Sequence, residues 1–302
     1  MVRREPLVVG ATAAAAGLGA LVRVLVTGAG GQLGRDSVAR FESGGHDVIA
    51  CDRTQLDVGD RDAVLSMVTT VRPAAIVHCA AWTAVDACEA DPDRAFRDNA
   101  LALRWMYEAT HRVGAHLCYL STDYVFRGDK AAPYVEWDEP APQSVYGRSK
   151  LAGEREVGHD ATLIRTSWVC GMHGNNMVKT ILRLVGQHDR LRFVADQRGH
   201  PTFADDLADA IYRLVIDRRA GVYHVTNQGA VSWFEFAQEV LRTAGLDPSR
   251  VEPITTAELD PPRPALRPAN SVLDNAVLRL AGLPLLADFR EPLRRMVRQL
   301  QA

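Results

Sequence analysis

The 302-residue chain has few cysteines, and they follow no metal-binding or redox pattern. The five are Cys51, Cys79, Cys88, Cys118 and Cys170, and no two of them form a CxxC pair. Because their number is odd and most lie in apolar stretches, we expect buried free thiols in a reducing compartment. The sequence therefore gives little support to a structural metal. Mg²⁺ stays open as a cofactor, although no ligand set in the sequence indicates it.

The chain also lacks an excess of charge of either sign. It has 35 Lys and Arg against 37 Asp and Glu, a formal net charge of −2. Without a strongly basic surface, we expect no strong attraction to nucleic acid or to acidic membranes. No internal repeat, low-complexity tract or interdomain linker is apparent. The composition, 47% hydrophobic and 24% charged, is that of a globular protein that can bury a large core as one domain or two.

Long hydrophobic runs are missing too, and the apolar stretch near the N-terminus is too short and too rich in small residues to predict a membrane span. It follows Arg3 and Arg4, a pattern that resembles a signal peptide, even a twin-arginine one. Against export, residues 21–26 run directly into a predicted strand without an obvious cleavage segment. We expect residues 1–21 to be a poorly ordered extension, with a targeting signal as the alternative. We expect a cytoplasmic protein with no stable membrane association.

A glycine-rich loop joins the first predicted strand to the first predicted helix. Gly28, Gly31 and Gly34 form a GxxGxxG pattern directly after the strand at 22–27. Such glycines permit a tight turn and let the backbone approach a pyrophosphate, which the helix N-terminus stabilises. The pattern departs from GxGxxG because Leu33 occupies the last position. It predicts a dinucleotide-binding loop, with a plain strand-to-helix turn as the alternative.

An acidic residue follows the second predicted strand, at residues 47–50. Asp52 lies at the distance along the chain at which a carboxylate meets the adenosine ribose of a dinucleotide. This acid favours NADH, whereas the neighbouring Arg53 can receive the 2′-phosphate of NADPH. The two residues leave the choice between NADH and NADPH open.

Predicted strands and helices alternate through the first half of the chain. The strands are at 75–79, 116–120 and 162–165, and the helices are at 60–71, 95–113 and 145–157. This alternation indicates right-handed βαβ units and a parallel sheet. Apolar strands between helices fit burial on both faces. We therefore predict an α/β fold with a doubly wound parallel sheet.

After Arg165 the alternation becomes less regular and proline becomes more frequent. Ser232 and Glu235 predict a capping box at the start of a helix. We predict a dinucleotide-binding Rossmann domain over 22–168. We expect a smaller, mainly substrate-binding region over 169–302, of which about 203–227 returns to the Rossmann core. The elements predicted in this region are helices at 205–216, 232–244, 274–281 and 289–300, and a strand at 222–225.

Tyr146 and Lys150 lie four residues apart in the predicted helix at 145–157, so both point from one face. A Lys ammonium beside a phenol lowers the phenol pKa, which would let it exchange a proton with a carbonyl or alcohol oxygen. Alone, this pattern also fits an exposed Tyr on a surface helix. Thr122 and Asp123 add support, since they follow a predicted strand at the end where doubly wound sheets bind ligands. A hydroxyl there can polarise a substrate carbonyl.

The glycine loop, the hydroxyl residues and the YxxxK pair together resemble an extended short-chain dehydrogenase/reductase. The exact residues of several longer runs resemble the dTDP-4-dehydrorhamnose reductase family, and these runs extend over nearly all of the chain from Val22. The matching runs are residues 31–34, 56–58, 80–86, 121–126, 145–154, 165–169, 174–176, 196–202 and 267–271.

The resemblance implies hydride transfer from a nicotinamide cofactor to the C4 ketone of dTDP-4-dehydro-L-rhamnose, which gives dTDP-L-rhamnose. It implies Tyr146 as proton donor, Thr122 as a hydrogen-bond donor to the same oxygen, and Lys150 on the nicotinamide ribose. The implied cofactor contacts are Gly28, Gly31, Gln32, Leu33, Gly34, Asp52, Asp57, Val58, Cys79, Ala80, Ala81, Tyr146 and Lys150. The implied substrate contacts are Thr122, Asp123 and Trp168, and we expect Asn176 to join them. Arg267 follows a proline-rich loop, where its planar guanidinium suits binding of a diphosphate, with an exposed loop arginine as the alternative.

Two other functions stay open at this point. One is a reductase or epimerase of another dTDP-4-keto-6-deoxyhexose, and the other is a non-catalytic, dinucleotide-binding regulatory relative. For the catalytic protein we expect a nucleotide-sugar substrate and a monomer or homodimer. We expect His78, Trp82 and Trp233 to be packing residues, and Glu154 to be a helix-surface ion-pair partner of a nearby Arg.

Overall fold

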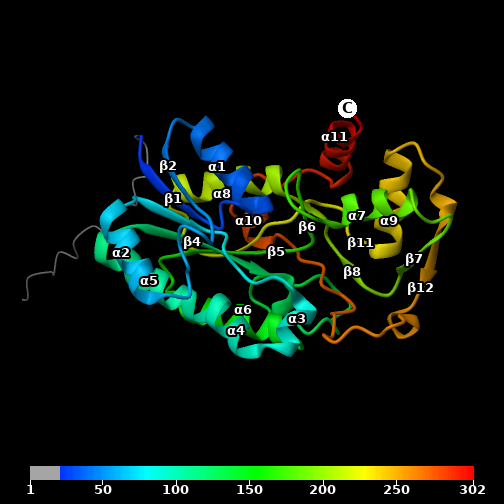
Figure 1. Ribbon diagram of the computed structural model, residues 1–302, viewed down its shortest axis with the longest axis horizontal. Coiled ribbons are helices and arrows are strands. Elements are labelled where there is room, and N and C mark those ends of the chain that lie inside the picture. Colours follow the sequence, from blue (N-terminus) through cyan, green and yellow to red (C-terminus); the bar gives the residue numbers. More distant parts are fainter. Residues whose placement is uncertain (1–20) are drawn as a thin grey trace, which may run out of the picture.

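The computed structural model describes residues 21–302, so the prediction for residues 1–21 lies, apart from Leu21, outside the described residues. The core is a six-stranded sheet of order β10-β5-β4-β3-β1-β2, in which every neighbouring pair is parallel (Figure 1). This sheet confirms the predicted fold class. Its strands are β1 (Arg23–Thr27), β2 (Asp47–Cys51), β3 (Ala75–His78), β4 (His116–Thr122), β5 (Thr162–Thr166) and β10 (Gly221–His224).

Helices cover both faces of the sheet (Figure 1). One face carries α1 (Gln32–Ser43), α8 (Ala204–Ile216) and α10 (Ala276–Leu280); the other carries α2 (Arg61–Val71), α5 (Ala102–Val113) and α6 (Val145–Arg155). Side chains alternate between the faces along each strand. Val24 and Val26 pack toward α1 and α8, while Leu25 packs toward α2 and α5. Burial on both sides explains why the strands read as continuous apolar runs.

The strand order reverses at β1, which lies between β2 and β3. The loops that follow β1 and β3 therefore diverge from one point at the carboxyl edge of the sheet, where such folds bind ligands. The two loops approach each other closely at Gly28, which has φ +66°. A Cβ there would lie 2.6 Å from the Ala80 backbone nitrogen, so both the conformation and the packing require glycine.

The single helix predicted over 95–113 is wrong in detail, because the structure interrupts it. The segment consists of α4 (Pro92–Phe96), a π-helical turn (Arg97–Leu101) and α5. The turn contains Asn99, whose fully buried amide accepts a 2.8 Å hydrogen bond from Trp82 N and donates one of 3.0 Å to Ser149 Oγ. These contacts with distant segments stabilise the wider turn.

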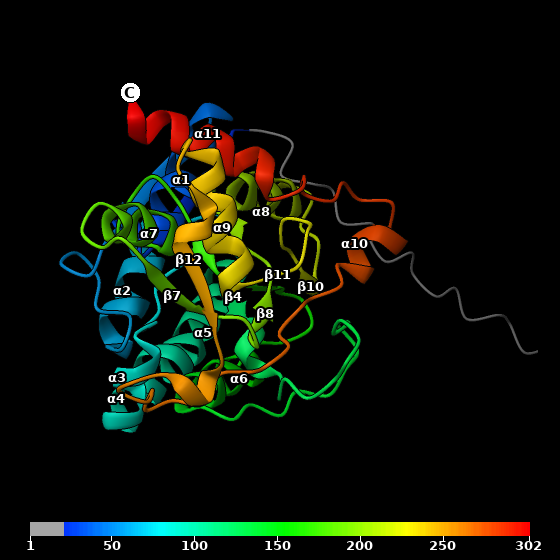
Figure 2. The same cartoon turned by 90° about the vertical axis from the view of Figure 1, so that its right-hand side faces the viewer.

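The chain after β5 builds a second apolar cluster at one end of the molecule (Figure 1), and this end faces the viewer in Figure 2. Strands β7 and β12 pair in parallel beside α9, and Ser232 and Glu235 form the predicted capping box at the start of α9. Helix α8 and strand β10, by contrast, belong to the layers of the main sheet. The elements of the second cluster are α7 (Met177–Val185), β7 (Leu191–Val194), α9 (Trp233–Thr243), β12 (Val251–Ile254) and α11 (Arg290–Gln301).

Short strands connect the main sheet and its helices to the second apolar cluster. Strand β6 (Val169–Cys170) pairs with β9 (Thr202–Phe203), and β8 (Arg198–Gly199) pairs with β11 (Val231–Ser232). Helix α3 (Val85–Ala90) precedes α4 near the start of α6.

Within residues 21–302, no helix is both long enough and apolar enough to cross a membrane.

Candidate active site

Three contiguous pockets run along the carboxyl edge of the sheet. The first lies between the ends of β2 and β3, the central pocket lies over β4 and α6, and the third, the arginine pocket, lies against β7. Gly28 and Ala81 line both the first and the central pocket. Tyr124 and Trp233 line both the central and the arginine pocket. One elongated ligand, or two ligands end to end, could therefore occupy the whole series.

The glycine loop forms the floor between the first and central pockets. Gly34 packs so tightly that a Cβ there would lie 2.1 Å from the Gly28 carbonyl oxygen. The N-terminus of α1 has no side-chain cap, so its amide groups remain available to an anion. By comparison, α2, α6, α7 and α9 are each capped by a side chain. This loop fits the pyrophosphate of a dinucleotide.

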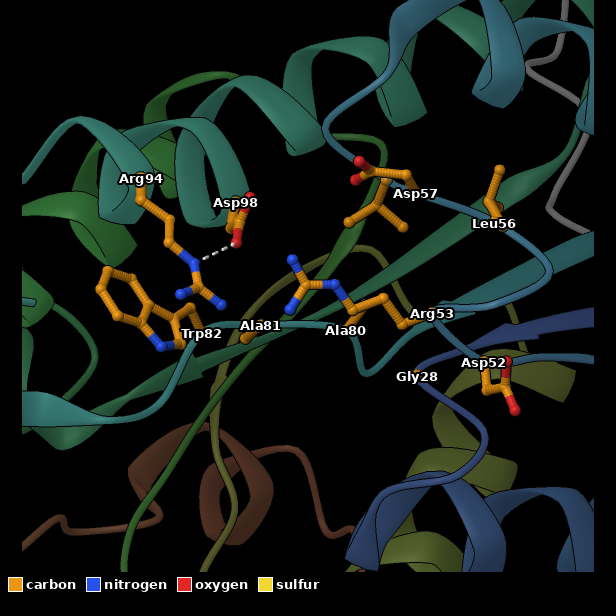
Figure 3. Close-up of a pocket in the computed structure, with 11 residues that line it drawn as sticks. Gly28, Asp52, Arg53, Leu56, Asp57, Ala80, Ala81, Trp82, Arg94 and Asp98 are labelled. Atoms are coloured by element: carbon orange, nitrogen blue, oxygen red, sulfur yellow. Dashed lines mark hydrogen bonds and ion pairs between the residues drawn. The ribbon is translucent and has the colours of Figure 1, made fainter. Parts of the chain in front are cut away.

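Asp52 and Arg53 both line the first pocket, and their side chains point in different directions (Figure 3). Asp52 lies beside Gly28, and its Oδ1 accepts hydrogen bonds from Thr54 Oγ1 at 2.6 Å and Thr54 N at 2.8 Å. These bonds lower the pKa of Asp52, which keeps the carboxylate ionised. The Arg53 side chain extends across the pocket (Figure 3). The pocket thus presents a negatively charged carboxylate and a positively charged guanidinium to the same ligand.

The predicted Tyr–Lys pair lines the central pocket. Ser144 caps α6 by accepting a 3.1 Å hydrogen bond from Gly147 N, so the helix begins just before Tyr146. Both Tyr146 and Lys150 are buried, and Lys150 Nζ donates a 2.6 Å hydrogen bond to the Leu120 carbonyl. Tyr146 packs edge to face with Tyr124, at a centroid distance of 5.7 Å.

The expected lowering of the Tyr146 pKa by Lys150 is wrong for this arrangement. Burial raises the pKa of Tyr146 above its usual value, and a side-chain interaction with Thr122 offsets only part of this effect. Burial also lowers the pKa of Lys150 to about 7, against the opposing charge of Glu154. The protein groups alone therefore keep Tyr146 protonated at neutral pH.

Thr122 and Asp123 end β4 directly over the central pocket. Thr122 Oγ1 donates a 3.0 Å hydrogen bond to Asp123 Oδ1 and accepts one of 3.2 Å from Tyr124 N. Burial raises the pKa of Asp123 to about 6. The strand end thus presents a hydroxyl and a buried carboxyl group beside Tyr146.

Glu154 is not the helix-surface residue that the sequence predicted. It is buried against Arg165 of β5, with Nη2 to Oε2 at 2.7 Å and Nε to Oε1 at 3.0 Å. Ser121 Oγ donates a further 2.5 Å hydrogen bond to Glu154 Oε1. The carboxylate therefore ties α6, β4 and β5 together beneath the central pocket.

Two tryptophans stack between the central and arginine pockets. The Trp168 and Trp233 rings lie 3.5 Å apart between centroids, with planes inclined by 10°. Trp168 has φ +45°, an uncommon conformation for a large residue, and a Cβ on Gly199 would lie 2.7 Å from its indole. The contribution of Trp233 was not predicted, because its sequence context shows only the start of a capped helix.

The arginine pocket combines apolar walls with Arg192, Arg263 and Arg267. Only Arg267 was predicted; Arg192 and Arg263 were missed because they come from distant segments that the fold brings together. Arg267 is held by a bidentate ion pair with Asp86 at the start of α3. Cations beside apolar surface suit an anion joined to an aromatic base.

All residues predicted to contact the cofactor line the first or the central pocket. Thr122, Asp123 and Trp168 also line the central pocket, and Arg267 lines the arginine pocket. Asn176 is outside the lining of these pockets: it caps α7 through Lys179 N and donates a 3.0 Å hydrogen bond to Gln32 Oε1. In the described part of the chain, no group of three or more His, Cys, Asp or Glu side chains is placed to hold a metal ion.

Fold and site together define an extended short-chain dehydrogenase/reductase. Comparison with known proteins narrows this class. The family model described as RmlD substrate binding domain matches residues 22–302, and a dTDP-4-dehydrorhamnose reductase of Streptomyces griseus is 42% identical over 90% of this chain and 91% of its own. The chain therefore belongs to the dTDP-4-dehydrorhamnose reductase (RmlD) family.

Two further comparisons bear on fold and cofactor. A dTDP-4-dehydrorhamnose reductase of Bacillus anthracis, solved in complex with NADP, superposes with a TM-score of 0.89 at 38% identity, covering 93% of this chain and 100% of that one. A probable dTDP-4,6-dihydroxy-2-methyloxan-3-one 4-ketoreductase of Streptomyces antibioticus is 43% identical over 90% of this chain and 94% of its own. Relatives with this extent of similarity thus carry more than one substrate name.

Proposed function

We propose that this protein reduces the C4 ketone of dTDP-4-dehydro-L-rhamnose to give dTDP-L-rhamnose. The observation that carries the proposal is that the buried side chains of Thr122, Tyr146 and Lys150 line one pocket, with the glycine loop on one side and an arginine-lined pocket on the other. Bound NADPH or NADH supplies the hydride. The chain holds that cofactor, positions the sugar and provides the proton.

The cofactor-binding residues divide between the first and central pockets. The uncapped N-terminus of α1 and the loop from Gly28 to Gly34 would hold the pyrophosphate. Asp52, Asp57 and Val58 would contact the adenosine end. Cys79, Ala80 and Ala81 would lie along the nicotinamide, and Lys150 would hold its ribose. Domain 22–168 would thus bind cofactor, and 169–302, apart from about 203–227, would mainly bind substrate.

Tyr146 is the proposed proton donor to the new alkoxide at C4. Its pKa is raised by burial, so the phenol is protonated at neutral pH before the reaction. Thr122 would hydrogen-bond the same oxygen and polarise the ketone. Asp123 beside it would contact the sugar, and Trp168 would pack against the sugar ring. The nucleoside diphosphate would then extend toward Arg267.

Asn176 has a different proposed role from the one its sequence suggested. Its Nδ2 donates to Gln32 Oε1 and, at 2.7 Å, to the Gly171 carbonyl, while its Oδ1 accepts from Lys179 N. Because these atoms are engaged with the protein, Asn176 would act on the ligands through Gln32 of the glycine loop.

Another dTDP-4-keto-6-deoxyhexose is the second candidate substrate, because the Streptomyces antibioticus relative with a different substrate name is as similar as the named dehydrorhamnose reductase. We also propose a cytoplasmic location and a monomer or homodimer. The former agrees with five cysteines that are all free in the structure. Sedimentation of the purified protein would decide between monomer and homodimer.

The test is NADPH or NADH oxidation, followed at 340 nm with freshly prepared dTDP-4-dehydro-L-rhamnose. Tyr146→Phe should reduce turnover by roughly 10²–10⁴-fold while cofactor binding persists. Tyr107→Phe is the matched control, because this Tyr also loses a hydrogen bond, to Asp160, but lies far along α5. Near-normal turnover of Tyr146→Phe would contradict the proton-donor assignment. Oxidation with another keto sugar alone would favour the second candidate.

A further inference from the structure

Asp86 links two parts of the chain that are distant in sequence. It lies in the first turn of α3, beside the cofactor-binding half of the cleft. Its carboxylate meets Arg267 in a two-pronged pair, with Nη1 to Oδ1 at 2.5 Å and Nη2 to Oδ2 at 2.7 Å. Arg267 is largely buried, with 14% of its side chain exposed. A planar guanidinium held at two points has a fixed orientation.

The same carboxylate holds more of the segment that contains Arg267. Its Oδ1 also accepts a 3.2 Å hydrogen bond from Ala265 N, and its Oδ2 lies 3.5 Å from Arg263 Nη1. We call residues 259–267 the strap, because Leu259, Arg263 and Arg267 form one wall of the arginine pocket. Asp86 therefore fastens this wall to the Rossmann half of the molecule.

We infer that Asp86 is a positioning residue for the substrate's nucleoside diphosphate, which it serves by aiming Arg267 and Arg263 into the arginine pocket. The inference rests on the proposed function, because it takes the arginine pocket to hold the nucleotide part of the substrate. It assigns a role to a residue that need not touch the sugar or the cofactor itself.

The charges in and around the pocket agree with this role. Arg192, Arg263 and Arg267 bring three positive charges, and Asp86 removes one. The remaining two match the two negative charges of a pyrophosphate diester. Hydrogen bonding from Arg267 lowers the pKa of Asp86 to about 2, so the carboxylate stays ionised in the working pH range. Asp86 thus separates cations that would otherwise repel one another before substrate binds.

The test compares Asp86→Asn with Glu108→Gln. Glu108 is a matched control, because it also holds an arginine, Arg61, in a bidentate pair and is exposed to the same extent, 32% against 31%. Asp86→Asn should raise the calorimetric Kd for dTDP and the KM for the keto sugar by at least about tenfold. The Kd for NADPH should not change, and kcat should change by less than about threefold. Glu108→Gln should alter none of these constants.

A charge swap separates positioning from simple fastening. The double variant Asp86→Arg with Arg267→Asp can re-form the ion pair across the strap, but it moves the acid to the pocket side. We expect this swap to leave dTDP binding as weak as in Asp86→Asn, since the pyrophosphate would face a carboxylate. Recovered dTDP binding would overturn the inference, because the pair would then only fasten the strap. Arg267→Lys, which keeps the charge but loses the fork, should also weaken dTDP binding.

The outcomes also distinguish this inference from the proposed function. If Asp86→Asn binds dTDP like the wild type while the wild type reduces the keto sugar, the inference is wrong and the proposed function stands. If the wild type binds dTDP, Asp86→Asn does not, and no tested keto sugar is reduced, the inference stands and the proposed substrate is wrong. A wild-type protein that binds no dTDP would overturn the inference directly.

Discussion

The ammonium group of Lys150 donates a 2.6 Å hydrogen bond to the carbonyl oxygen of Leu120, inside a site where the lysine is only 2% exposed. The Tyr119 ring lies 4.3 Å from the same Nζ. These contacts fix the side chain but do not compensate for its removal from water, and burial lowers the Lys150 pKa to about 7. The protein therefore holds a charged group at a position that disfavours the charge.

The first prediction is that Lys150→Met increases stability while it abolishes activity. A folded-state pKa of about 7, against the usual 10.5 of a lysine, costs the folded protein at most about 5 kcal/mol below pH 7. The variant leaves the Leu120 carbonyl unpaired, which costs about 1–3 kcal/mol. We expect a net increase of about 1–3 kcal/mol in the free energy of unfolding at pH 6, measured by urea denaturation.

The pH dependence gives this prediction its sign. Because the folded pKa of Lys150 lies below the unfolded one, the unfolded chain binds the extra proton between about pH 7 and 10.5. The loss of stability caused by burying the Lys150 charge is complete below pH 7, and it decreases as the pH rises toward 10.5. The advantage of Lys150→Met over the wild type should therefore be smaller at pH 9 than at pH 6. A constant difference would show that the lysine is not the titrating group.

The second prediction concerns Gly199, which packs against the tryptophan stack. A Cβ at this position would lie 2.7 Å from the Trp168 indole, so Gly199→Ala must displace Trp168 from Trp233. We expect a changed near-ultraviolet circular dichroism spectrum and a KM for the sugar nucleotide that rises by about tenfold. Gly186→Ala is the control, because the atoms nearest its added Cβ are 3.5 Å away. If Gly199→Ala has the same spectrum and the same KM as the wild type, the tryptophan stack does not face the substrate.

The parallel sheet and the pair of Tyr146 and Lys150 could be predicted because each leaves a pattern within a short stretch of sequence. Apolar strands, the glycines of the first loop and the spacing of Tyr146 and Lys150 are all visible within short windows. Contacts between distant segments leave no such pattern. Arg192 and Arg263 meet at one pocket only because β7 and the strap fold together. Trp233 likewise becomes a site residue only through Trp168.

Glu154 shows why local pattern can also mislead. A Glu one turn after Lys150 on a polar-looking helix favours a solvated ion pair. The fold instead places Arg165 of β5 against it, so that both side chains are 6% exposed. The partner is a strand residue that follows in the chain, and no periodicity in the helix indicates it. The π-helical turn at Asn99 escaped prediction for the same reason.

The third prediction follows from this buried pair. Glu154→Ala leaves the Arg165 charge buried without its partner, which should cost about 3–5 kcal/mol of unfolding free energy. Glu156→Ala is a matched control at the end of the same helix, because Glu156 also forms a bidentate pair, with the half-exposed Arg104. That variant should cost no more than about 1 kcal/mol. Similar losses in urea denaturation would contradict the structural distinction.

The fourth prediction concerns the choice between NADH and NADPH, which depends on two neighbours at the end of β2. The Asp52 carboxylate, held by Thr54, suits the free 2′-hydroxyl of NADH and repels a 2′-phosphate. The Arg53 side chain extends across the same pocket and suits the phosphate (Figure 3). Removing the charge of Asp52 and removing the charge of Arg53 should therefore move the preference between NADH and NADPH in opposite directions.

The measured quantity is the ratio of kcat/KM for NADPH to that for NADH. Asp52→Asn should raise this ratio by about tenfold, since it removes the charge that repels the phosphate, and Arg53→Ala should lower it by a similar factor. Added salt should shrink the second effect, because the phosphate contact is exposed and screened. The double variant should return toward the wild-type ratio if the two residues act independently. A ratio that is unchanged in both single variants would show that cofactor choice is made elsewhere in the first pocket.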